Sequence, residues 1–178
     1  DISKLESGKL EILPTEYELF SVLNDCYNMT KARAENKGLA FQMQIDPELP
    51  SGMYGDEVRI RQIINNLLSN AVKYSHEKGQ IVVELQLKQK TMIISVADQG
   101  IGISKEKLRH LYSRFLDGDY RRMNTVGTGI GLSLTHDLVV LHHGKINCQS
   151  VEGEGTTFTI QIPTDKSAYS DEEIEYSE

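Results

Sequence analysis

Residues 56–75 are the stretch of this chain that leaves the least freedom of interpretation, because they fit only an amphipathic helix. Asp56 is a favourable N-cap, and neither proline nor glycine interrupts the residues that follow. At about 100° per residue, the apolar positions fall on one face that we expect to be buried: Ile60, Ile63, Ile64, Leu67, Ala71 and Tyr74. A neighbouring polar stripe carries Gln62, Asn66, Asn70 and Lys73. Amides suit either a partly buried binding site or a solvated face, and the helix alone does not separate these two readings.

The composition is typical of a soluble globular domain. The chain has 178 residues, of which 39% are hydrophobic and 25% charged, enough for one domain with a core. The net charge of −7 disfavours general nucleic-acid binding, and no apolar run approaches the roughly 20 residues of a membrane span. Cys26 and Cys148 fit no metal spacing, so we expect them in the core and favour a reducing compartment. Since the chain opens without Met, we expect it to be a fragment.

The order of the remaining elements predicts an α+β fold. We expect a helix over 15–36 capped by Thr15, a connector over 52–55, a short helix capped by Ser104 and a helix from Gly129 to about His143. Alternating residues predict strands over 40–45, 81–87, 91–97, 145–150 and 157–162, mostly joined as hairpins. Helices should therefore pack on one face of a largely antiparallel sheet, in a two-layer sandwich. Residues 114–128 are predicted as a functional or disordered loop. Residues 165–178, with six carboxylates and one lysine, are predicted to be disordered.

Three weak signals point to a nucleotide site. Asp98 ends a strand before Gly100 and Gly102, so its carboxylate could accept a hydrogen bond from an exocyclic amine such as that of adenine. Residues 127–132 (GTGIGL) open a helix, whose free N–H groups favour phosphate. The amides on the helix over 56–75 are oxygen ligands that suit Mg²⁺, and Lys73 could neutralise phosphate charge. Each signal also has a plain structural reading: a turn, a hinge and a polar face.

Taken in this order, the signals resemble the catalytic ATP-binding domain of sensor histidine kinases, in the superfamily shared with gyrase-type and heat-shock-chaperone ATPases. Residues 66–75 (NLLSNAVKYS) resemble the N box, and 98–103 (DQGIGI) and 127–132 resemble the two glycine boxes. Residues 112–115 (YSRF) take the place of the F box, with Tyr for the usual first Phe, and 153–158 (GEGTTF) resemble the last glycine motif. The resemblance covers about residues 15–163 and implies the Bergerat-type fold, with a mixed five-stranded sheet and about three helices on one face.

The resemblance also implies roles for individual residues. Asn70 would ligate Mg²⁺ and act in catalysis with Lys73, and Asp98 would recognise adenine. Residues 117–126 would form a mobile lid, in which Arg121 or Arg122 contacts phosphate or is simply solvated. The complete set expected to bind ATP is Asn66, Asn70, Lys73, Tyr74, Asp98, Gly100, Gly102, Ile103, Gly127, Thr128, Gly129, Ile130, Gly131, Leu132 and Thr157.

One departure from the superfamily separates phosphoryl transfer from hydrolysis. Asn66 stands where the hydrolases carry a glutamate that activates water, and an amide is not a base at neutral pH. We therefore expect a kinase. An ATP-hydrolysing chaperone-type module and a non-catalytic nucleotide-binding module are the alternatives.

The histidine that accepts the phosphoryl group is expected to lie outside this chain. His136 precedes Asp137 but falls inside the predicted helix from Gly129, so we read it as part of the domain's own packing or surface, and we expect His142 and His143 to favour the helix dipole. Residues 1–13 would be the end of a dimerisation helix and a linker, 14–164 the catalytic domain and 165–178 a tail or linker. The expected partners are the upstream helices of a homodimeric parent and a response regulator or receiver domain. We expect a cytoplasmic domain, whose parent could be anchored to a membrane.

Overall fold

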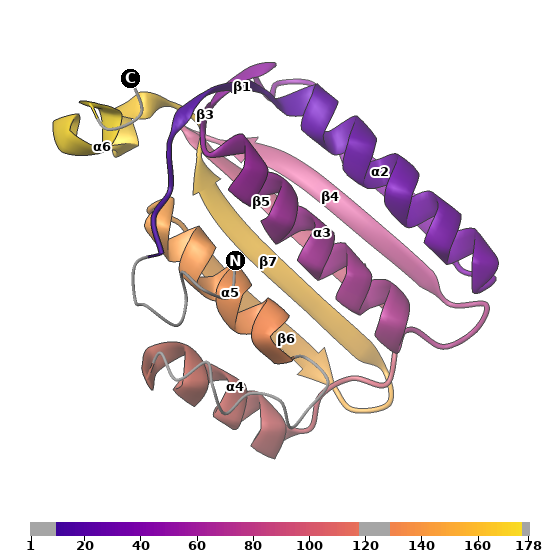
Figure 1. Cartoon of the computed structure of the whole chain (residues 1–178). Coiled ribbons are helices and arrows are strands. Elements are labelled where there is room, and N and C mark those ends of the chain that lie inside the picture. Colours follow the sequence, from indigo (N-terminus) through magenta and orange to yellow (C-terminus); the bar gives the residue numbers. More distant parts are fainter. Residues whose placement is uncertain (1–9, 118–128, 176–178) are drawn as a thin grey trace.

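In the computed structural model, which describes residues 10–117 and 129–175, a five-stranded sheet carries helices on one face, as the sequence predicts. Figure 1 shows α2, α3 and α5 lying side by side across that face. The principal elements are β1 (Thr15–Glu18), α2 (Leu19–Asn36), β2 (Ala40–Ile45), β3 (Gly52–Gly55), α3 (Glu57–Tyr74), β4 (Gln80–Lys88), β5 (Thr91–Asp98), α4 (Lys105–Asp117), α5 (Gly129–Leu141), β6 (Lys145–Val151) and β7 (Gly155–Pro163).

The sheet has the strand order β2-β4-β5-β7-β6 and is mixed. Hairpins join β4 to β5 and β6 to β7, both antiparallel as predicted, and β5 also pairs with β7. The exception is β2, which runs parallel to β4. Along β5 and β7 every second residue is buried beneath the helices. The register of these two central strands therefore decides which side chains face the helical layer.

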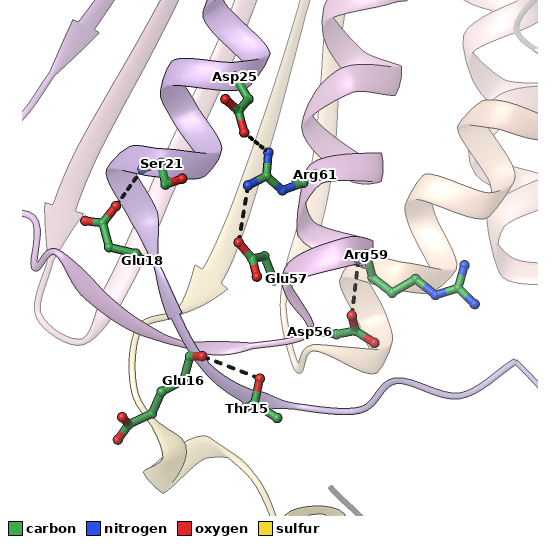
Figure 2. Close-up of polar contacts among 9 residues, drawn as sticks. All are labelled: Thr15, Glu16, Glu18, Ser21, Asp25, Asp56, Glu57, Arg59 and Arg61. Carbon is green, nitrogen blue, oxygen red and sulfur yellow. Dashed lines mark hydrogen bonds and ion pairs between the residues drawn. The ribbon is translucent and has the colours of Figure 1, made fainter.

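α3 lies at the centre of the helical layer and has the predicted bounds. The carboxylate of Asp56 caps it by accepting the Arg59 N–H at 3.3 Å (Figure 2). The predicted apolar face is buried, with Leu68 in addition, and Tyr74 is half-buried. Arg61, on another side of the helix, pairs with Glu57 on its own helix and with Asp25 on α2, which ties the two helices together (Figure 2).

A two-stranded ribbon at the N-terminal end of α3 was not predicted. β1 pairs antiparallel with β3, so residues 15–18 are a strand and not the first turn of α2. The cap of α2 is therefore Glu18 and not Thr15: its carboxylate accepts the Ser21 N–H at 2.7 Å (Figure 2). The pairing of β1 with β3 buries Tyr17 against the core, a long-range contact that a local propensity does not encode.

α4 is longer than expected, because residues 114–117, which were predicted to begin a loop, continue the helix. Ser104 begins this helix as predicted, with its hydroxyl accepting the Lys107 N–H at 3.2 Å. α4 lies beside α5, at the end of the sheet away from the β1–β3 ribbon (Figure 1). This position makes α4 one wall of the site described below.

The acidic segment after Thr164 is ordered through residue 175, which corrects the prediction of disorder. It forms a short 3₁₀ turn, η2 (Lys166–Ala168), and α6 (Asp171–Glu175). Tyr169 is buried, with its ring 5.5 Å from Tyr54 and 5.3 Å from His143, centre to centre. A single buried aromatic, with Glu173 paired to His143 at 3.0 Å, holds a segment whose composition alone favours disorder.

Removal of the Tyr169 ring is expected to lower the free energy of unfolding by about 2 kcal/mol, because a buried aromatic is replaced by a cavity. Urea denaturation of Tyr169→Ala measures this loss. Tyr169→Phe is the matched control and should change stability by less than about 0.5 kcal/mol, since the hydroxyl makes only a 3.5 Å contact to the Tyr54 carbonyl. An alanine variant as stable as the wild type would contradict this packing.

His142 has a different role from the one predicted. It is fully buried, and burial lowers the pKa of its imidazole, so it is neutral and does not offer a charge to the dipole of α5. Nδ1–H donates to the Leu138 carbonyl at 2.7 Å, and Nε2 accepts the Asp56 N–H at 3.1 Å. His142 therefore links the end of α5 to the start of α3.

Both cysteines are free and buried, as predicted. Burial raises the pKa of the Cys148 thiol to about 12, which keeps it protonated. Among residues 10–117 and 129–175, no helix combines the length and the apolar character that a membrane crossing requires.

Candidate ATP-binding site

A pocket of about 220 Å³ opens between the C-terminal half of α3, the start of α4, the end of β5 and the start of β7. Its walls combine a carboxylate, an amide and a largely apolar lining. The lining residues are Asn70, Tyr74, Asp98, Ile101, Gly102, Ile103, Lys107, His110, Leu111, Thr156 and Phe158. Five of the predicted residues therefore meet around one cavity: Asn70, Tyr74, Asp98, Gly102 and Ile103.

Asp98 ends β5 with its carboxylate held in one orientation. Oδ1 accepts two backbone N–H groups, from Gly100 at 2.9 Å and from Thr156 at 3.2 Å. Oδ2 has no hydrogen-bond partner among the described residues, so it can accept a hydrogen bond from a ligand. Burial raises the pKa of Asp98, while the two N–H groups and His76 act in the opposite direction. A partly desolvated carboxylate with one open oxygen is suited to accept a hydrogen bond from an amine group of a ligand.

The glycines after Asp98 let the loop contact other backbone closely. A Cβ on Gly100 would lie 2.2 Å from the Tyr74 carbonyl oxygen, and that carbonyl accepts the Ile101 N–H at 3.1 Å. Gly102 has φ of +68°, and a Cβ there would lie 2.2 Å from the Val151 carbonyl oxygen. The loop over 98–103 is thus packed between the end of α3 and the β6–β7 hairpin.

α3 contributes the polar wall through Asn70 and Tyr74. The Asn70 amide has no hydrogen-bond partner within the described part of the chain, which leaves it available to a ligand. The Tyr74 hydroxyl is buried, and within that same part it also lacks a partner. Lys37, at the end of α2, donates to the carbonyls of Val72 and Lys73 at 2.7 and 2.9 Å. This contact fixes the last turn of α3 and hence the direction of both side chains.

Four other predicted residues do not line the pocket. Asn66, one turn before Asn70, donates to the Thr135 hydroxyl at 3.3 Å, across the contact between α3 and α5. Lys73 is exposed, with Nζ 5.3 Å from the centre of the Tyr74 ring. Gly100 shapes the loop, and Leu132 is fully buried in α5.

Thr157 does not line the pocket, but both of its neighbours do. Thr156 and Phe158 point towards the helices and line the pocket, whereas Thr157 is half-exposed and lies outside the lining. The alternation of Phe158, Ile160 and Ile162 could have shown this, because residue 156 shares their face.

The second glycine motif is described only in part. Gly129, Ile130 and Gly131 form the first turn of α5, as predicted. Gly127, Thr128 and the expected lid residues Arg121 and Arg122 lie outside the described residues, as do the side chains of the F-box residues 112–115.

Six of the lining residues were not predicted from the sequence. Ile101, Leu111, Thr156 and Phe158 are uncharged, while Lys107 and His110 lie one turn apart on α4 and are exposed. The α4 residues were missed because a short polar helix offers no motif. Their contribution follows only from where α4 packs.

The donor set fits a metal ion held mainly by phosphates. No cluster of three or more His, Cys, Asp or Glu side chains suited to a metal occurs in the part of the chain that the structure describes. Mg²⁺ commonly binds through few protein ligands together with phosphates and water. The open amide of Asn70, aimed into the pocket, is therefore a suitable protein ligand.

His136 lies away from this pocket, on the surface of α5. Its Nδ1 is 3.2 Å from Asp137 Oδ1, and both side chains are about 20% exposed. Burial lowers the pKa of His136 and raises that of Asp137 to about 6. The pair fits the expectation that this histidine belongs to the domain's own packing or surface.

Comparison with known proteins agrees with this geometry. The circadian input-output histidine kinase CikA of Thermosynechococcus vestitus is 36% identical over 167 residues, which are 92% of this chain and 23% of that protein. The catalytic domain of histidine kinase ThkA has a TM-score of 0.72 at 24% identity, covering 88% of this chain and 99% of that one. Full-length ShkA in complex with AMPPNP has a TM-score of 0.73 at 23% identity, covering 91% and 33%. These two structures establish the shared fold.

The match to a family covers most of the chain. Residues 55–166 match the family described as "Histidine kinase-, DNA gyrase B-, and HSP90-like ATPase". This range contains every residue that lines the pocket. The chain belongs to this ATPase family and is an ATP-binding catalytic domain of the sensor histidine kinase type.

Proposed function

We propose that this domain binds Mg-ATP in the pocket between α3 and α4 and that its parent protein transfers the γ-phosphoryl group to a histidine on dimerisation helices. The observation that carries the proposal is Asp98, whose open Oδ2 lies in the same cavity as the open amide of Asn70. The chain spans 23% of the length of the CikA kinase.

Different residues of the pocket bind the adenine, the phosphates and the metal ion. Oδ2 of Asp98 accepts the adenine amine, and Ile101, Ile103 and Phe158 enclose the ring in an apolar slot that excludes water. The Lys107 ammonium at the rim attracts the triphosphate. Asn70 holds the metal ion, which when bound neutralises charge on the phosphates. Catalysis then consists mainly of positioning and electrostatic stabilisation.

Hydrolysis is the less favoured activity, since the residue one turn before Asn70 is an amide. Asn66 cannot take a proton from water, and its Nδ2 donates to Thr135. We propose that the phosphoryl group passes instead to a histidine upstream and then to a response regulator or receiver domain. We further propose that this takes place in the cytoplasm, within a homodimer.

The test combines the purified domain with a separate fragment of the parent that carries the dimerisation helices. Labelled phosphate from γ-labelled ATP should appear on that fragment in an acid-labile, base-stable form, as expected of a phosphohistidine. Steady release of inorganic phosphate without transfer would instead indicate a hydrolase. A domain that bound no nucleotide would indicate a non-catalytic module.

Asn70→Ala is expected to weaken Mg-ATP binding about tenfold, because the metal ion loses its protein ligand. In calorimetry with EDTA present to remove the metal, the affinities of the variant and the wild type for ATP should differ much less. Asn65→Ala is the matched control, since Asn65 is half-buried on the same helix but does not line the pocket. Equal losses with and without Mg²⁺ would argue against a metal-binding role for Asn70.

A further inference from the structure

The loop that carries Asp98 is held in place by the tip of the β6–β7 hairpin. The Gly153 N–H donates to the Ile101 carbonyl at 2.7 Å, and the Thr156 N–H donates to Asp98 Oδ1 at 3.2 Å. The Ile103 N–H donates to the side chain of Ser150 at 2.7 Å. Ser150 is therefore the side chain of β6 that bonds directly to the backbone of this loop.

The hydroxyl of Ser150 uses its full hydrogen-bonding capacity. Its proton goes to the Gly155 carbonyl at 2.9 Å, and one acceptor site takes the Ile103 N–H. The Thr156 hydroxyl lies 2.8 Å away and, with the Ser150 proton already committed, donates to the remaining acceptor site. A hydroxyl offers one donor and two acceptor positions, so none is left over.

Ser150 does not line the pocket, yet it contacts two residues that do, Ile103 and Thr156. Ile103 belongs to the apolar slot. Thr156 fixes the Asp98 carboxylate through its backbone N–H. One half-buried hydroxyl thus joins the glycine loop, the hairpin and the residue that orients Asp98.

We propose that Ser150 is a positioning residue for adenine recognition. This inference rests on the proposed binding of ATP in the pocket. Without the hydroxyl, the Ile103 N–H and the Gly155 carbonyl lose their partner, and water or a shift of the loop must replace it. The loop then holds Oδ2 of Asp98 less firmly, so both affinity for ATP and discrimination against GTP fall.

The experiment compares two variants of similar shape, Ser150→Thr and Ser150→Val, since Thr keeps the hydroxyl and Val replaces it with a methyl group. Calorimetry should give a Kd for ATP within about twofold of wild type for the Thr variant and about tenfold weaker for the Val variant. The preference for ATP over GTP should fall by a similar factor in the Val variant only. Amide hydrogen exchange at Ile103 should be faster in the ligand-free Val variant.

Thr159→Val is the matched control, because Thr159 is half-exposed on β7 and outside the pocket. It should leave both nucleotide affinities unchanged. If Ser150→Val does not fold, the same measurements are made on Ser150→Ala, which adds no bulk. The alanine variant should show the same loss of affinity for ATP and of preference over GTP.

A Val or Ala variant that loses thermal stability but keeps its affinity for ATP and its preference over GTP would overturn the proposal, because it would show a purely structural role. A wild-type domain that bound neither nucleotide would overturn the proposed function, and with it this role of Ser150. The wild-type titration therefore separates the two failures.

Discussion

Asp98→Asn is expected to weaken ATP binding about 100-fold while the domain stays folded. Oδ1 accepts the N–H groups of Gly100 and Thr156, so the variant must keep its carbonyl oxygen in that place. Its NH₂ group then takes the position of Oδ2 and presents a donor to the adenine amine, which is itself a donor. Losing a hydrogen bond to a charged acceptor and leaving a buried donor unpaired together cost about 2.7 kcal/mol, which corresponds to that factor.

The dependence of binding on pH provides the control for this prediction. Burial raises the pKa of Asp98 above its ordinary value. A protonated carboxyl group no longer offers an acceptor at both oxygens, so wild-type affinity for ATP should fall as the pH is lowered through that raised pKa. The asparagine variant lacks this ionisation and should show a flatter profile by calorimetry over the same range. Equal affinities and parallel profiles in the two proteins would refute the role of Asp98.

Gly102→Ala is expected to lower the free energy of unfolding by at least about 3 kcal/mol and to abolish measurable ATP binding. The residue has φ of +68°, which costs an L-residue about 1–2 kcal/mol. The added Cβ would also lie 2.2 Å from the Val151 carbonyl oxygen, so the glycine loop and the hairpin must move apart. This displacement breaks the packing that aligns Ile101, Ile103 and Asp98.

Gly38→Ala separates the two causes. Gly38 has a similar φ of +73°, but nothing lies within 4 Å of the position that its Cβ would take. The control should therefore lose only about 1 kcal/mol, as measured by urea denaturation, and should bind ATP normally. If the two variants lost similar amounts of unfolding free energy, the close contact with Val151 would not contribute to the effect of Gly102→Ala.

The sequence predicts the elements whose signal is local. The cap and apolar face of α3, the alternation in both hairpins and the Asp98 loop all follow from residues that are neighbours in the chain. The β1–β3 ribbon depends instead on pairing between residues 15–18 and 52–55. Short segments with no apolar period of their own, such as Gly52–Gly55, gain their structure only from the partner strand.

The candidate site shows the same division. Asn70 and Asp98 could be identified because each stands in a motif, whereas Lys107 and His110 become visible only when α4 is placed beside the pocket. The segment over 165–175 was misjudged because composition counts its carboxylates and overlooks one well-buried ring, Tyr169. Neutral His142 was misjudged because burial overrides the attraction of a helix end.

The strand order has a consequence for synthesis of the protein. β7 is the last of the described strands in sequence, yet it lies between β5 and β6, and it supplies Thr156 and Phe158 to the pocket. A nascent chain that has emerged from the ribosome only as far as β6 already contains Asn70 and Asp98 but has no closed cavity around them. Nucleotide bound in this pocket can therefore stabilise the domain only once β7 has been synthesised.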